Sequence, residues 1–298
     1  MDQLIATILV GISSGATYSL MALAIVLVWR STRIVNFAQA GQAIFSTYIA
    51  YEVLTRSGSF LMAIILAVAV GALLGAGLDY FLIRTLSRHV SDGAVAAIAP
   101  VIATLGVLGI IRGVVGLIWG NDFRQIESPV SQVGFVFNGE SYPFSPYSLL
   151  VVGISAVLIL VLSILFQKTS LGLSLRASAF NPEIARLAGV RVGMMRTIGW
   201  ALAGATGAVA GLLVTPTSYL APNSLDLLLV SGFVAAVIGG LDSMPGAVVG
   251  GLILGVGLAF VISYFSPTLA LPASFVVLIV VLLAKPTGIF GARGMRSA

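Results

Sequence analysis

Residues 4–29 read LIATILVGISSGATYSLMALAIVLVW, a stretch that contains no acidic or basic side chain. About 20 predominantly apolar residues are enough for an α-helix to cross the hydrocarbon core of a bilayer. Strands of a membrane β-barrel are about half as long and alternate between apolar and polar residues. The stretch therefore predicts a membrane-spanning α-helix. We expect it to be retained, because it lacks the basic start and the cleavage site of a secretory leader.

Similar apolar stretches recur to the end of the chain and predict an all-α polytopic membrane protein with eight or nine transmembrane helices. Only 8% of the 298 residues are charged, whereas soluble proteins carry about 25%, so there is too little charge to cover a soluble fold. We expect one membrane domain over residues 1–298. The candidate spans are residues 4–29, 34–54, 60–83, 94–119, 147–167, 197–214, 225–241, 246–265 and 269–284. Two of them could be re-entrant, since 34–54 begins with several polar residues and 225–241 is short.

The basic residues lie almost entirely on one side of this predicted topology. With the N-terminus outside, twelve of the 15 Lys and Arg fall in inner loops and in the tail, which is the side that positively charged loops prefer. Arg56 and Arg124 fall outside, and Arg112 falls within a span. The pattern predicts an outer N-terminus and a cytoplasmic C-terminus. It also explains the net charge of +5 by the lipid bilayer, without nucleic acid as a partner.

The sequence carries no catalytic or metal-binding constellation that we can defend. It contains no cysteine, which excludes thiol chemistry and thiolate ligands, and no GxxxxGK[ST] loop that would hold ATP phosphates. We therefore expect a chain that is not an enzyme and holds no cofactor of its own.

The predicted inner loop, residues 168–196, contains the signals of a short helix. Asn181 suits an N-cap, Pro182 suits the first helical position, and Glu183 favours the positive end of the helix dipole. Gly189 can end the helix in the left-handed conformation. A helix of about two turns is too short to be stable alone. The loop is therefore either a basic connector or a docking helix for a cytoplasmic partner.

Several stretches resemble a known family of permeases. Glu183-Ile184-Ala185, followed by Gly189, is similar to the EAA motif of importer-type ABC permeases, with Ile in place of the first Ala. Other stretches resemble LivH-type permease subunits of branched-chain (hydrophobic) amino acid ABC importers. These are GATYSLMAL at 15–23, RSTRIVNFAQ at 30–39, SLG at 170–172, LRA at 175–177, NPE at 181–183, ARLAGV at 185–190 and GGLDSMPGAVVGG at 239–251.

The resemblance implies an ABC importer permease fold in a bacterial plasma (inner) membrane. It implies a second permease subunit, which is either a related chain or a second copy, and an extracytoplasmic substrate-binding protein. Two cytoplasmic ATP-binding subunits would hold and hydrolyse the ATP. The implied substrates are branched-chain amino acids, although relatives of this type also handle urea, short amides and other small polar solutes. The residues implied in coupling to the ATPase are Asn181, Pro182, Glu183, Ala185, Arg186 and Gly189.

Polar residues within the predicted spans have two interpretations. Asn36, Gln39 and Gln42 are spaced three apart, which would place them on one helical face. Polar groups at membrane depth usually face a watery cavity or bond to a neighbouring helix. Together with Tyr18 they therefore either line the translocation pathway or fix helix packing.

Two charged residues at membrane depth and one glycine-rich stretch also stand out. We expect Arg112 to extend to the interface in preference to binding a substrate carboxylate, and Asp79 to pair with Arg84 or Arg88. The stretch at 239–251 either packs helices closely or breaks a helix to form a gate at Gly240, Pro245 and Gly246.

Two further hypotheses remain open. A stand-alone secondary transporter or channel usually places acidic residues inside the membrane, whereas here the acids lie at span ends and in loops. A membrane scaffold without transport would leave the polar residues at 36–42 without a role.

Overall fold

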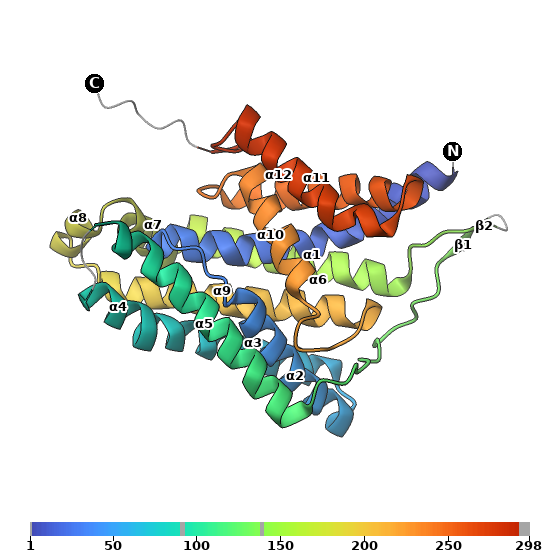
Figure 1. Ribbon diagram of the computed structural model, residues 1–298, viewed down its shortest axis with the longest axis horizontal. Coiled ribbons are helices and arrows are strands. Elements are labelled where there is room, and N and C mark those ends of the chain that lie inside the picture. Colours follow the sequence, from blue (N-terminus) through green and yellow to red (C-terminus); the bar gives the residue numbers. More distant parts are fainter. Residues whose placement is uncertain (1, 90–92, 138–139, 292–298) are drawn as a thin grey trace. The chain divides into compact units, whose positions relative to one another are not determined.

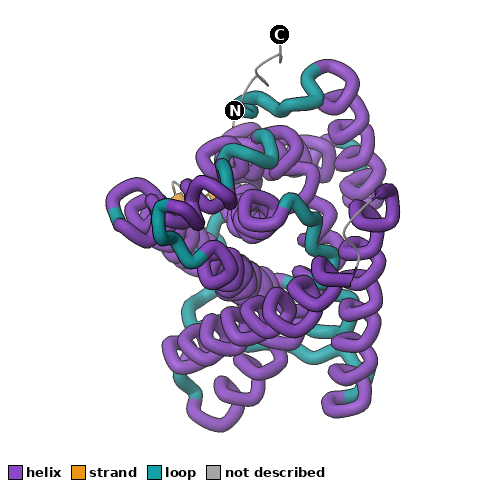
Figure 2. The backbone as a smooth tube through the Cα atoms, turned by 90° about the vertical axis from the view of Figure 1, so that its left-hand side faces the viewer, coloured by secondary structure: helices purple, strands orange, loops and turns teal. Residues whose placement is uncertain are grey.

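The computed structural model describes residues 2–89, 93–137 and 140–291, and this part of the chain is almost entirely helical (Figure 2). The longer helices are α1 (Asp2–Thr32), α2 (Gln39–Ser57), α3 (Phe60–Gly77), α5 (Gly93–Trp119), α6 (Pro146–Lys168), α9 (Val192–Val214), α10 (Asp226–Gly239), α11 (Met244–Tyr264) and α12 (Ala270–Ala284). The shorter elements are the π-helical η1 (Leu78–Ile83), α4 (Arg84–His89), α7 (Ser170–Phe180), α8 (Pro182–Leu187), and the 3-10 turns η2 (Thr215–Thr217) and η3 (Pro267–Leu269). Strands β1 (Val136–Phe137) and β2 (Glu140–Ser141) form a two-residue antiparallel ribbon. The prediction of an all-α fold is confirmed apart from this ribbon.

Within the described residues, seven helical segments are long and apolar enough to cross a membrane. They coincide with seven of the nine predicted spans: Gln3–Thr32, Phe60–Ser87, Ile98–Trp119, Pro146–Lys168, Val192–Thr217, Met244–Tyr264 and Pro267–Ala284. The two remaining predicted spans, 34–54 and 225–241, are those for which a re-entrant form stayed open. Helix α2 begins with polar residues, and α10 has only 14 residues, which span about 21 Å of a core about 30 Å thick.

The chain divides into two compact units, each of which is considered by itself. One unit comprises residues 27–127 and 158–229, and its centre is the mutual packing of α2, α3 and α9 (Figure 1). Glycines permit this close approach. A Cβ atom on Gly75 of α3 would lie 2.1 Å from the carbonyl oxygen of Trp200 on α9, and one on Gly71 would lie 2.5 Å from that of Gly204. The structure thus confirms that small residues bring helix backbones into contact.

The other unit comprises residues 1–26, 128–157 and 230–298. Here the first part of α1 packs on α11, where a Cβ atom on Gly255 would lie 2.3 Å from the Cα atom of Gly15. The Ser19 hydroxyl adds a polar contact by donating a hydrogen bond to the Val248 carbonyl over 2.8 Å. Close glycine contacts and one interhelical hydrogen bond therefore hold these two helices together.

Candidate functional site

Helix α8 is the predicted short helix, and both of its ends are capped as expected. The Asn181 side-chain oxygen accepts hydrogen bonds from the backbone N–H groups of Glu183 and Ile184, over 3.0 and 3.1 Å. Pro182 occupies the first turn, where a missing N–H costs nothing. The left-handed residue after the helix is Gly189, with φ of +82°. These contacts stabilise six residues that would not form a helix alone.

The end of α8 has the hydrogen bonds of a Schellman motif. The Gly189 N–H donates to the Arg186 carbonyl over 3.0 Å, and the Val190 N–H donates to the Ala185 carbonyl over 2.9 Å. Ala185 is buried, so this face of α8 packs on its own chain. The segment from α8 to the start of α9 is therefore held by backbone bonds and by packing.

The exposed face of the same segment is unusually apolar. Phe180, Ile184 and Leu187 have exposed fractions of 87%, 62% and 90%. They lie between the apolar segments Pro146–Lys168 and Val192–Thr217, in a connection whose charged residues are mostly basic. Apolar side chains in a polar connector are typical of a protein interface.

Helix α7 precedes α8, in a stretch that the sequence pattern predicts only as part of the inner loop. Its N-cap is Thr169, whose hydroxyl oxygen accepts a hydrogen bond from the Gly172 N–H over 3.0 Å. Gly172 fits against the end of α6, since a Cβ atom there would lie 2.2 Å from the Leu165 carbonyl oxygen. The Thr cap was visible in the sequence, but the close approach that requires Gly172 was not.

A buried cluster of ionic contacts ties the end of α3 to the start of α9. Asp79, in η1, is fully buried, and its carboxylate lies 3.3 Å from the Nε of Arg84 and 2.7 Å from the Nε of Arg196. The Thr197 hydroxyl donates a hydrogen bond to the same carboxylate over 2.6 Å. The predicted pairing with Arg84 is confirmed, whereas the side chain of Arg88 lies outside the described part. Arg196 was missed, because no local pattern reveals a partner so distant in sequence.

The polar residues near the start of α2 do not share one helical face as predicted. Helix α2 begins at Gln39, so Asn36 precedes it, and all three side chains are buried. The Asn36 amide donates to the Gln39 side-chain oxygen over 3.2 Å, and the Gln39 amide donates to the Ala203 carbonyl of α9 over 2.9 Å. Asn36 and Gln39 therefore fix the entry of α2 against α9.

Gln42 differs from these two residues. Its amide nitrogen and oxygen are both buried and form no hydrogen bond with the described residues. A buried amide without a hydrogen-bond partner is costly. Tyr18, in the other unit, is half-buried beside Ser231. Pathway roles for these four residues stay predictions.

The structure gives Arg112 a partner that the sequence did not predict, and its extension to the interface stays a prediction. Its guanidinium forms an ion pair with Asp226 at the start of α10. The two residues are far apart in sequence. Asp226 lies at the edge of a short predicted span, and no local pattern predicts its pairing with Arg112. The pair satisfies an expensive charge inside α5 without any substrate.

The glycine-rich turn between α10 and α11 is tightly packed. The interruption lies at residues 240–243, so Pro245 is in the first turn of α11 and does not itself break a helix. Gly240 has φ of +99°, and a Cβ atom on Gly246 would lie 2.3 Å from the Gly239 carbonyl oxygen. The Phe290 N–H donates to that carbonyl over 3.0 Å. The close-packing interpretation is thus confirmed, and the gating role of Gly240, Pro245 and Gly246 stays a prediction.

Comparison with known proteins covers nearly the whole chain. Residues 7–284 match the family described as branched-chain amino acid transport system / permease component. A probable branched-chain amino acid transport permease protein LivH of Methanocaldococcus jannaschii is 31% identical over 91% of this chain and 88% of its own. The high-affinity branched-chain amino acid transport system permease proteins BraD of Pseudomonas aeruginosa and LivH of Escherichia coli K12 are 28% and 27% identical. Each alignment covers 94% of this chain. They cover 94% of the BraD chain and 93% of the LivH chain. Among solved structures, PsaBC from Streptococcus pneumoniae in complex with Fab aligns with a TM-score of 0.49 and 14% identity, over 96% of this chain and 91% of that chain.

Proposed function

Because the chain belongs to the family of branched-chain amino acid transport system permease components, we propose that it forms half of the translocation pathway of an ATP-driven importer. Its substrates would be branched-chain amino acids or related small solutes, as the names of the relatives suggest. In this proposal the chain lies in a bacterial plasma membrane with α8 on the cytoplasmic side. The observation that carries the proposal is the doubly capped α8 with its exposed apolar face.

The ATPase would dock on α8, and its motion would reach the membrane helices through a short rigid route. Val190 ends the α8 turn by bonding to Ala185, and α9 begins two residues later. Near the start of α9, Arg196 and Thr197 hold Asp79 in η1, which directly follows α3. A displacement of α8 would therefore move α9 and α3 together, along with the pathway that they border.

The number of docking helices in the chain suggests how many subunits the importer contains. The chain offers one α8, so two permease chains would engage two ATP-binding subunits, which hold the ATP. The second permease would be a related subunit or another copy of this chain. An extracytoplasmic binding protein would deliver the substrate, and this chain would convert the motion of the ATPases without hydrolysing ATP itself.

Reconstitution in lipid vesicles tests this function. The chain would be combined with its candidate sister permease, the ATPase pair and the binding protein, and uptake of radiolabelled leucine would be measured. We expect uptake only with hydrolysable ATP, and competition by urea or acetamide would identify a different solute class. Uptake at an equal rate without the ATPases would contradict the proposal and favour a secondary transporter or channel.

A further inference from the structure

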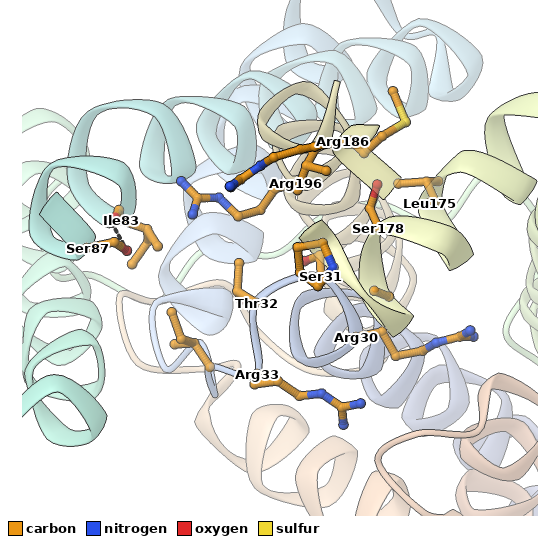
Figure 3. A pocket seen from close by; sticks show the side chains of 15 residues that line it. Arg30, Ser31, Thr32, Arg33, Ile83, Ser87, Leu175, Ser178, Arg186 and Arg196 are labelled. Atoms are coloured by element: carbon orange, nitrogen blue, oxygen red, sulfur yellow. Dashed lines mark hydrogen bonds between the residues drawn. The ribbon is translucent and has the colours of Figure 1, made fainter. Parts of the chain in front are cut away.

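A cavity of about 270 Å³ lies beside α8, within the unit that contains α2, α3 and α9 (Figure 3). Its lining comes from the end of α1, from η1 and α4, from α7 and α8, and from the start of α9. The ends of three apolar segments line the cavity. Two segments end there, and one begins there: Gln3–Thr32 and Phe60–Ser87 end at the cavity, and Val192–Thr217 begins at it. In a bilayer crossed by these three segments, the cavity would lie where the helices pass from hydrocarbon into the headgroup layer.

The charge of the lining has one sign. Four arginines contribute to it, and no acidic residue does: Arg30, Arg33, Arg186 and Arg196. Figure 3 shows Arg186 and Arg196 extending in the same direction, toward the side of the cavity formed by Ile83 and Ser87. Arg30 and Arg33 extend away from these two side chains. Like charges directed into one space repel unless an anion lies between them.

Only part of this charge is accounted for by the chain itself. Arg196 is paired with Asp79, whereas no ion pair joins Arg186 to any described acidic side chain. The hydroxyl of Ser178, another lining residue, is buried and forms no hydrogen bond with the described residues. Phosphate oxygens accept hydrogen bonds readily from planar guanidinium groups and from hydroxyl groups.

The lining also includes an uncommon backbone conformation. Arg33 has φ of +58°, the only positive φ at a non-glycine position among the residues that the structure describes. Such a conformation costs about 1 to 2 kcal/mol and persists where surrounding contacts require it. Here it ends α1 sharply at the cavity.

We propose that this cavity binds a phosphate-bearing anion between Arg186 and Arg196, with Ser178 as an additional donor. Its volume is close to the lower limit of ligand pockets, about 300 Å³, which suits a phosphate or a small headgroup. The phosphate can come from an anionic phospholipid, because basic pockets between membrane helices attract such headgroups, or from free phosphate. An anion there bridges α8 to the ends of the membrane helices. Its binding does not depend on an ATPase, so failure of this proposal is separate from failure of the transport function.

Binding is measured on the purified full chain in a neutral detergent at about 0.5 M salt, where exposed charges are largely screened. The probes are short-chain phosphatidylglycerol, phosphatidylcholine of the same chain length, and inorganic phosphate. We expect Arg186→Gln to weaken anion binding at least about tenfold, the usual effect of losing a charged hydrogen bond. Arg191→Gln removes an exposed arginine of the same connection that does not line the cavity, and it should change binding less than about twofold.

Ser178→Asp serves as a second variant, because it places a carboxylate in the cavity and should abolish binding. Retained helical circular dichroism shows that each variant is folded. Selective binding of phosphatidylglycerol identifies the lipid as the source, and equal binding of inorganic phosphate identifies the free anion. The proposal is overturned if neither phosphatidylglycerol nor inorganic phosphate binds, or if Arg186→Gln and Arg191→Gln weaken binding equally.

Discussion

The buried carboxylate of Asp79 lies 2.7 Å from the Nε of Arg196, and this ion pair joins the end of the α3 span to the beginning of α9. Arg84 and Thr197 complete the contacts of the carboxylate. Removing one partner of a buried pair leaves the other charge without compensation, which is more harmful than never having had the pair. This ion pair is therefore where the route from α8 to the membrane helices is most easily broken.

Asp79→Asn should destabilise the protein by about 3 kcal/mol, because Arg84 and Arg196, which are 25% and 24% exposed, lose the buried carboxylate that balances their charge. Thermal unfolding in detergent measures the effect, and Asp122→Asn, in an exposed loop, is the control that should change little. At a temperature where both variants are folded, Asp79→Asn should also lower leucine uptake per ATP hydrolysed. An Asp79→Asn variant as stable and as active as the control would show that the cluster is not needed.

Gly75→Ala should weaken the contact between α3 and α9, since the new methyl group would overlap the Trp200 carbonyl. Overpacking of this kind costs about 1 to 3 kcal/mol. Gly109→Ala, on α5, is a matched control because its Cβ atom would meet nothing within 4 Å. That change should be neutral or stabilise the helix by up to about 1 kcal/mol. Equal melting temperatures for the two variants would refute the close-packing account.

Gly189→Ala should strain the turn after α8, because φ of +82° costs a residue with a Cβ atom about 1 to 2 kcal/mol. Gly58→Ala imposes a similar strain at the end of α2, where φ is +65°. Both variants should lose comparable stability in thermal unfolding, but only Gly189→Ala should reduce ATP-coupled uptake in vesicles. If both variants transport equally well, the geometry of the α8 turn has no part in coupling.

Most of the fold could be predicted from local sequence. Long apolar runs revealed seven membrane spans, and the polar start of 34–54 and the shortness of 225–241 marked the two helices that differ. Helix α8 was predictable for the same reason, because Asn181, Pro182 and Gly189 act on backbone atoms only a few residues away.

Features that join distant segments were not predictable. Arg196 and Asp226 were missed as partners of Asp79 and Arg112, since the helices that bring them together are ordered by tertiary packing. Spacing placed Asn36 on a helical face, but α2 begins only at Gln39, and the Asn36 side chain instead bonds to the backbone of Ala38 over 3.0 Å. Periodicity predicts a shared face only where the helix forms.

The measurement that tests the central claim most directly compares uptake with ATP hydrolysis in the same vesicles for Leu187→Asp. Leu187 is 90% exposed, so the change should leave the fold intact, but a carboxylate there would be buried without a partner once an ATPase docks. Leu173→Asp, an exposed leucine of the preceding helix, is the control. We predict that Leu187→Asp lowers leucine uptake per ATP hydrolysed at least about tenfold, in line with the cost of an unpaired buried charge, while the control stays near the unmodified protein. Normal coupled uptake by Leu187→Asp would contradict the assignment of α8 as the docking helix.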